Sequence, residues 1–132
     1  MSDRAPAIVL GHGTIAAGMV SAVERITGRG ARLHPLSNDG LGGPEILALL
    51  RETMRATGAT VLFTDLPAGS CSTAAVRAVH ERPGAVLVMG ANLPALLYFA
   101  MHEELAPADA AREAAARGGA ALKTYPDAAR AG

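Results

Sequence analysis

The stretch from Ala5 to Ala16, which reads Ala-Pro-Ala-Ile-Val-Leu-Gly-His-Gly-Thr-Ile-Ala, decides the fold. A short apolar run ends at Gly11, and apolar residues then recur at helical spacing as far as Gly28. A continuous apolar run is typical of a parallel strand that is buried on both faces. The stretch therefore predicts the first strand and helix of an α/β domain, with His12 in the loop between them.

The rest of the chain repeats this alternation of strands and helices. We expect further strands over residues 31–36, 59–64, 85–89 and 120–124, and further helices over residues 43–57, 72–81, 93–101 and 107–119. Such an order predicts a mostly parallel sheet with helices on both faces. We find no internal boundary, so residues 1–132 are expected to form one domain, with a core over about 5–124 and a loose tail over 125–132.

Composition excludes several classes of function. The 132 residues are 50% apolar with a formal net charge of zero, which argues against a nucleic-acid-binding protein and against binding to an anionic membrane surface. Cys71 is the single cysteine, which suits a reducing compartment. We see no signal peptide and no apolar run of about 20 residues, so we expect a cytoplasmic protein that is not inserted into a membrane. The remaining histidines (His34, His80 and His102) have no spacing that suggests a metal site.

His12 and Asp65 are the candidate reactive pair. Each directly follows an apolar strand, and if the strand order is 2-1-3-4 the two loops meet at one edge of the sheet. A carboxylate that accepts one ring N–H fixes the tautomer of a histidine and stabilises positive charge on the ring. The pair is therefore suited to nucleophilic attack by the other ring nitrogen.

Four flanking residues could bind an anion beside this pair. Gly13 and Thr14 precede a predicted helix, whose first N–H groups and dipole attract negative charge. Gly69 and Ser70 precede another helix and can add an N–H and a hydroxyl. Cys71 and Asn92 are further candidates for the pocket, although Asn92 is first of all a predicted helix cap.

Other interpretations of these residues remain open. A histidine in a glycine-rich turn is often only a loop residue, and an aspartate after a strand is often a turn former. Residues 11–16 also match the dinucleotide-binding pattern G-x-G-x-x-A. The acidic residue which that pattern requires is poorly placed, because Asp39 lies in a turn signal, and the chain is short for a dinucleotide-binding fold.

Three motifs together resemble the mannose-type enzyme IIA domains of the bacterial sugar phosphotransferase system. They are Gly11-His12-Gly13, then Thr64-Asp65-Leu66 followed by Gly69-Ser70, and finally Gly90-Ala91-Asn92-Leu93-Pro94. The motifs occur in the order and spacing of that family, and the resemblance covers about residues 5–124.

The resemblance implies a flavodoxin-like fold with strand order 2-1-3-4 and a phosphotransferase that works through a phosphohistidine. His12 would accept a phosphoryl group from HPr and pass it to an enzyme IIB, which serves the membrane subunits IIC and IID. Asp65 would orient the ring and Ser70 would lie beside the phosphoryl group. No metal or organic cofactor is implied. The family is also homodimeric, so residues 120–124 would be an antiparallel strand exchanged between subunits.

This chain departs from the family pattern at Ala68, Cys71, Thr73 and Ala95. The departures leave open which sugar is transported and which enzyme IIB is the partner. They also leave open whether the protein serves transport or regulation. A phosphotransfer domain of the dihydroxyacetone-kinase type is a second possibility within the class. From a different class, a module that binds an anion or nucleotide without covalent chemistry would use the same cleft.

Overall fold

Strands and helices alternate as expected in the computed structural model, which describes residues 4–127. The elements, in chain order, are β1 (Ala7–Gly11), α1 (Ile15–Thr27), a short 3-10 helix (Gly30–Arg32), β2 (Leu33–Ser37), α2 (Gly43–Thr57), β3 (Val61–Thr64), α3 (Ser70–His80), β4 (Val86–Met89), α4 (Leu93–Met101) and α5 (Pro107–Ala120). The predicted alternation of elements is confirmed up to α5.

The four strands form one parallel sheet in the order β2-β1-β3-β4, which confirms the predicted order. β1 lies between β2 and β3, so that Leu10 is in register with both Leu36 and Thr64. The chain therefore leaves β1 and β3 at the same edge of the sheet, where ligands of such sheets bind.

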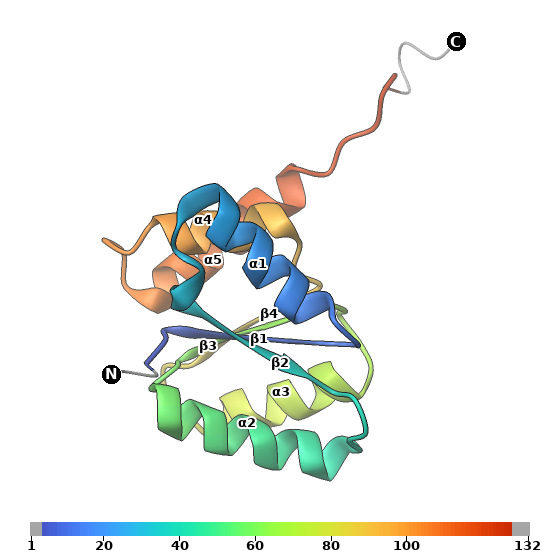
Figure 1. The fold of residues 1–132 in the computed structure, drawn as a ribbon, viewed down its shortest axis with the longest axis vertical. Coiled ribbons are helices and arrows are strands. Elements are labelled where there is room, and N and C mark those ends of the chain that lie inside the picture. Colours follow the sequence, from blue (N-terminus) through green and yellow to red (C-terminus); the bar gives the residue numbers. More distant parts are fainter. Residues whose placement is uncertain (1–3, 128–132) are drawn as a thin grey trace.

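Helices cover both faces of the sheet (Figure 1). On one face, α1, α4 and α5 enclose a core that includes Val9, Phe63 and Phe99. On the other face, α2 and α3 enclose a second core that includes Ile8 and Leu62. Successive residues of a strand point to opposite faces, and every residue of β1 and β3 is buried. The central strands are apolar for this reason, except at Thr64, the last residue of β3.

Glycines end two of the helices where the sequence predicts. Gly28 after α1 and Gly58 after α2 have φ values of 72° and 78°, and each N–H closes the last helical turn. This left-handed conformation is easily accessible only to glycine. α3 begins at Ser70, two residues before the predicted start, directly after Gly69 with a φ of 102°.

The predicted strand over residues 120–124 is not formed in the structure of the single chain. Ala120 belongs to α5, and the N–H of Ala121 bonds to the carbonyl oxygens of Arg117 and Gly118. Alanine favours the helix, and a strand needs a neighbouring strand to receive its hydrogen bonds. Exchange between subunits stays a prediction, and part of the predicted tail (128–132) lies outside the described residues.

No helix within residues 4–127 has both the length and the apolar character that crossing a membrane requires.

Candidate functional site

His12 lies in the short loop between β1 and α1, at the carboxyl edge of the sheet. Its side chain is 45% exposed. The next residue, Gly13, has a φ of 56°, which lets the chain turn from the strand into the helix with little strain. The local sequence thus presents an imidazole at the surface, close to the start of a helix.

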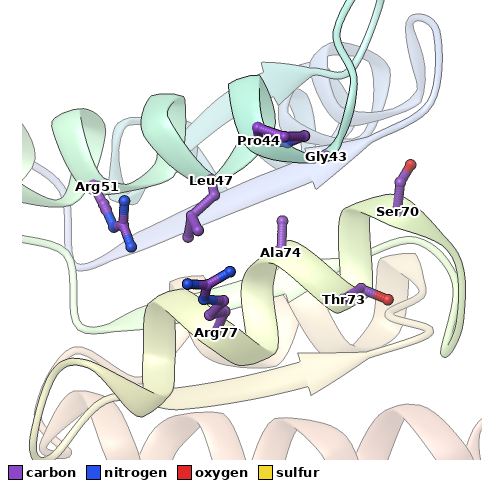
Figure 2. Close-up of a pocket in the computed structure, with 8 residues that line it drawn as sticks. All are labelled: Gly43, Pro44, Leu47, Arg51, Ser70, Thr73, Ala74 and Arg77. Carbon is purple, nitrogen blue, oxygen red and sulfur yellow. The ribbon is translucent and has the colours of Figure 1, made fainter.

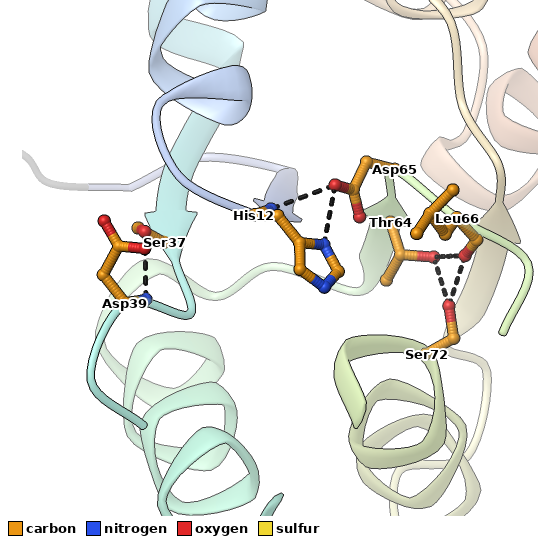
Figure 3. A network of polar contacts seen from close by, with 7 residues as sticks. All are labelled: His12, Ser37, Asp39, Thr64, Asp65, Leu66 and Ser72. Carbon is orange, nitrogen blue, oxygen red and sulfur yellow. Dashed lines mark hydrogen bonds and ion pairs between the residues drawn. The ribbon is translucent and has the colours of Figure 1, made fainter. Parts of the chain in front are cut away.

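Asp65 holds this imidazole from the end of β3 (Figure 3). One carboxylate oxygen, Oδ2, accepts the backbone N–H of His12 at 3.0 Å and lies 2.9 Å from Nδ1 of the ring. The carboxylate is mostly buried, with 8% of the side chain exposed. A carboxylate can only accept here, so in the neutral form of the ring Nδ1 carries the proton and Nε2 keeps its lone pair.

The environment of Asp65 favours its ionised form. Burial acts to raise the pKa of the carboxyl group, but the hydrogen bonds from the His12 backbone and ring and the charge of the ring outweigh it. The net effect is a pKa below the ordinary value. An ionised carboxylate is what the ring needs in order to bear more positive charge.

Gly11 is a site residue that sequence reasoning missed. A Cβ at this position would lie 2.5 Å from Cγ2 of Ile15 and 3.3 Å from both Cγ and Oδ2 of Asp65. Gly11 therefore leaves the space in which the Asp65 carboxylate approaches the loop. Its sequence signals are its place between the strand and His12 and its part in the motif Gly11-His12-Gly13, and neither signal reveals a neighbour 54 residues away.

The predicted anion-binding residues surround the start of α1 and the start of α3. Gly13 and Thr14 are exposed, and within residues 4–127 their N–H groups make no hydrogen bond. The N–H groups of Gly69 and Ser70 are equally free within this range. These donors are suited to phosphoryl oxygens.

Ser70 also lines a groove of about 530 Å³ between α2 and α3 (Figure 2). The hydroxyls of Ser70 and Thr73 lie towards one end, and the side chains of Arg51 and Arg77 lie towards the other. Arg51 is engaged by Glu81, with Nε donating to Oε1 at 2.8 Å. The other lining residues are Gly43, Pro44, Leu47 and Ala74.

Cys71 lies in the first turn of α3 and is buried. Burial raises the pKa of its thiol, and the negative charge of nearby Asp65 raises it further. The helix start does not lower this pKa, and the residue acts as a small packed side chain rather than as a reactive thiolate.

Asn92 caps α4, as predicted, since its Oδ1 accepts the N–H of Ala95 at 3.1 Å. Its Nδ2 donates to the carbonyl oxygen of Gly118 at 2.8 Å. Both ends of the amide are thus used to join α4 to α5, and neither contacts His12. Among the described residues, 4–127, we find no group of three or more His, Cys, Asp or Glu side chains that could hold a metal ion.

The comparison with known families agrees with this geometry. Residues 7–116 match the sequence profile of the family EIIA-man, described as the PTS system fructose IIA component. The chain belongs to this family. The resemblance inferred from the three motifs is thereby confirmed, and the chain is a component of a sugar phosphotransferase system. No curated protein is significantly similar in sequence.

Solved structures of such components share the fold at low sequence identity. The EIIA component from Streptococcus agalactiae is 16% identical, with a TM-score of 0.78 over 90% of this chain and 95% of that one. The mannose/sorbose-specific IIA subunit from Enterococcus faecalis is 20% identical, with a TM-score of 0.77 over 92% and 94%. The IIA protein associated with the fucose utilization operon of Streptococcus pneumoniae is 19% identical, with a TM-score of 0.77 over 93% and 94%.

Proposed function

We propose that this EIIA-man protein carries a phosphoryl group on Nε2 of His12. It receives the group from phosphorylated HPr and passes it to a histidine of a cognate enzyme IIB in the cytoplasm, which serves the membrane subunits IIC and IID. One observation carries the proposal: Asp65 occupies Nδ1 at 2.9 Å, while the ring is 45% exposed. Nε2 is therefore the nitrogen that an incoming phosphoryl group can reach.

The transfer needs no metal or organic cofactor, because the donor and the acceptor are both protein histidines. The lone pair of Nε2 forms the new N–P bond as the P–N bond of the donor histidine breaks, and the leaving ring nitrogen keeps that electron pair. Positive charge develops on the His12 ring during this exchange. Asp65, held ionised beside Nδ1, stabilises this charge, while the N–H groups of Gly13 and Thr14 stabilise the phosphoryl oxygens.

The test is the intact mass of the protein after incubation with phosphoenolpyruvate, enzyme I and HPr. We expect the wild type to gain one acid-labile phosphoryl group and His12→Ala to gain none. His80→Ala is the matched control, because His80 is an exposed histidine at the end of α3. A wild type that stays unmodified, while a second IIA protein is modified in the same mixture, would contradict the proposal and favour a non-covalent anion-binding module.

The same proposal includes a homodimer that exchanges the C-terminal segment. Within residues 4–127, β4 is the last strand of the sheet order and pairs along one edge only, with β3. The segment after α5 exposes apolar side chains, with Leu122 85% and Tyr125 91% exposed. Both observations support pairing of this segment with the β4 edge of a second copy.

A further inference from the structure

Two buried hydroxyl groups converge on one backbone carbonyl beside the site (Figure 3). Oγ1 of Thr64 donates to the carbonyl oxygen of Leu66 at 3.0 Å, and Oγ of Ser72 donates to the same oxygen at 2.5 Å. The two hydroxyl oxygens lie 2.9 Å apart. Both side chains are buried, so the contact between the two hydroxyls is shielded from water, and the bonds to the Leu66 carbonyl are partly buried. We refer to Thr64, Ser72 and the Leu66 carbonyl as the hydroxyl clamp.

Two members of the hydroxyl clamp, Thr64 and Leu66, are the sequence neighbours of Asp65. Thr64 is the last residue of β3 and Leu66 follows Asp65 directly, so the clamp ties together the residues on either side of the carboxylate. Ser72 adds an anchor in α3. The Leu66 side chain is 51% exposed and contributes little packing, which leaves its carbonyl as the main point of attachment. The carbonyl of Thr64 is itself held by the N–H of Ala91 at 2.8 Å.

Asp65 needs such an attachment because burying part of its carboxylate costs free energy. While Oδ2 receives both N–H groups of His12, Oδ1 is buried and has no hydrogen-bond partner within residues 4–127. A buried carboxylate oxygen without a partner favours movement towards water. A loop that was free to move would let the carboxylate turn outward and release Nδ1 of His12.

We propose that Thr64 and Ser72 are positioning residues that hold Asp65 against His12 by fixing the Leu66 carbonyl. Their role in phosphoryl transfer rests on the proposed function, whereas their effect on Asp65 and the ring exists in the unphosphorylated protein. Without the clamp, the ring loses its fixed tautomer, and a smaller fraction of the molecules presents a free lone pair at Nε2. The lowered pKa of the Asp65 carboxyl then rises towards its ordinary value, because the bonds from His12 that lower it are lost.

The variants Thr64→Val and Ser72→Ala test this proposal. Valine has nearly the shape of threonine without the hydroxyl, and alanine is compatible with a helix. A separate variant, Thr64→Ser, keeps a hydroxyl at this position and should behave as the wild type does. Thr57→Val is the matched control: it removes a buried hydroxyl, at the last residue of α2, that donates to the carbonyl oxygen of Thr53 at 2.7 Å and accepts the N–H of Ala59 at 3.1 Å.

Nitrogen NMR of the His12 ring and carbon NMR of the Asp65 carboxyl, in the absence of any phosphoryl donor, provide the direct measurement. We expect both Thr64→Val and Ser72→Ala to mix the two ring tautomers and to raise the pKa of Asp65. The rate of phosphorylation should fall by about 10- to 100-fold, the range expected for a small misplacement of a catalytic group. Thr57→Val should lower stability and leave all three quantities unchanged.

The proposal is wrong if the folded Ser72→Ala and Thr64→Val proteins keep the wild-type tautomer and Asp65 pKa. It is equally wrong if Thr57→Val changes the ring as much as Thr64→Val does, since any buried hydroxyl would then suffice. Should Thr64→Val fail to fold, Ser72→Ala alone decides. A wild type that is never phosphorylated would remove the proposed function, while the NMR measurements would still decide whether the clamp positions Asp65.

Discussion

At the scale of single residues, the site depends on one carboxylate oxygen that receives two N–H groups of the same histidine. This arrangement assigns different roles to the two ring nitrogens, since Nδ1 is protonated and held while Nε2 is free. Gly11 provides the space for the carboxylate, and the hydroxyl clamp fixes the backbone next to it. Each contribution can be removed by a single substitution.

Asp65→Asn should reduce the rate of His12 phosphorylation by about 10²- to 10⁴-fold, a range set by the loss of the orienting aspartate in histidine-based catalysis. The amide has the shape of the carboxylate but carries no charge to balance the ring. Rapid-quench kinetics with phosphorylated HPr measures the rate. A variant that reacts at the wild-type rate would show that Asp65 does not assist the transfer.

Stability should depend on pH through the same carboxyl group. Because the folded-state pKa of Asp65 lies below its ordinary value of 3.8, ionised Asp65 stabilises the fold above that pH. This contribution decreases as the pH falls through the lowered pKa. Urea unfolding of the wild type and Asp65→Asn should therefore show a constant difference at neutral pH that shrinks in acid. A difference that grows in acid would contradict the assignment.

Gly11→Ala should destabilise the protein by about 1–3 kcal/mol, as overpacking of a dense site does. The new methyl group would lie 2.5 Å from Cγ2 of Ile15 and would also press on Asp65. Gly18→Ala in α1 is the control, because a Cβ there meets no atom within 4 Å and should stabilise the helix by up to about 1 kcal/mol. Denaturant unfolding measures both, and equal effects of the two substitutions would count against the crowding.

At the scale of the elements, three helices begin at the edge of the sheet where β1, β3 and β4 end. Within residues 4–127, the N–H groups of Gly13 and Thr14, directly before α1, and of Ser70, at the start of α3, make no hydrogen bond. α4 begins instead with the capping side chain of Asn92, which also binds the last turn of α5. Gly118 makes this junction possible, since a Cβ there would lie 2.7 Å from both Ala95 Cβ and Asn92 Oδ1.

Asn92→Ala should therefore reduce the free energy of unfolding by about 1–2 kcal/mol, the usual cost of losing a helix cap, and leave the phosphorylation rate of His12 unchanged. Asn38→Ala is a matched control, because Asn38 bonds to Gly11 and Leu41 through its backbone groups, and the substitution leaves these bonds in place. Thermal unfolding and a phosphorylation assay distinguish the roles. A slower reaction with unchanged stability would instead place Asn92 at the phosphoryl site.

At the scale of the whole molecule, β4 is the last strand of the sheet within residues 4–127, and the apolar residues Leu122 and Tyr125 after α5 are exposed. Pairing of the two between copies would cover both features and would explain why this segment forms no strand in the single chain. The reactive pair, in contrast, is complete within one chain. Carrier chemistry and assembly can thus be tested separately.

Removal of residues 122–132 should convert a dimer into a monomer, as measured by light scattering. The truncated chain keeps all the helices and strands of the described residues, so its far-ultraviolet circular dichroism should change little. The control is Met101→Ala, which removes another exposed apolar side chain, at the C-terminal end of α4. This substitution should leave the dimer intact in the same light-scattering measurement. A full-length protein that is monomeric at all concentrations would contradict the exchange.

The sequence by itself determined the alternation of elements, the helix ends at Gly28 and Gly58, and the pairing of His12 with Asp65. These features follow from local periodicity, from the conformational freedom of glycine, and from the rule that parallel strands end at one edge. The three ordered motifs also identified the family. Each of these signals lies within one short stretch of the chain or in several short stretches taken together.

Only the tertiary structure decided which ring nitrogen is free, why Gly11 must be small, and how Thr64 and Ser72 hold the loop. It also decided that the Asn92 side chain donates a hydrogen bond to Gly118 of α5 and that residues 120–124 form no strand in the single chain. The physical reason is that hydrogen bonds and close contacts depend on differences of a few tenths of an ångström between side chains far apart in the sequence. Packing of the whole domain sets those distances, and no local pattern encodes them.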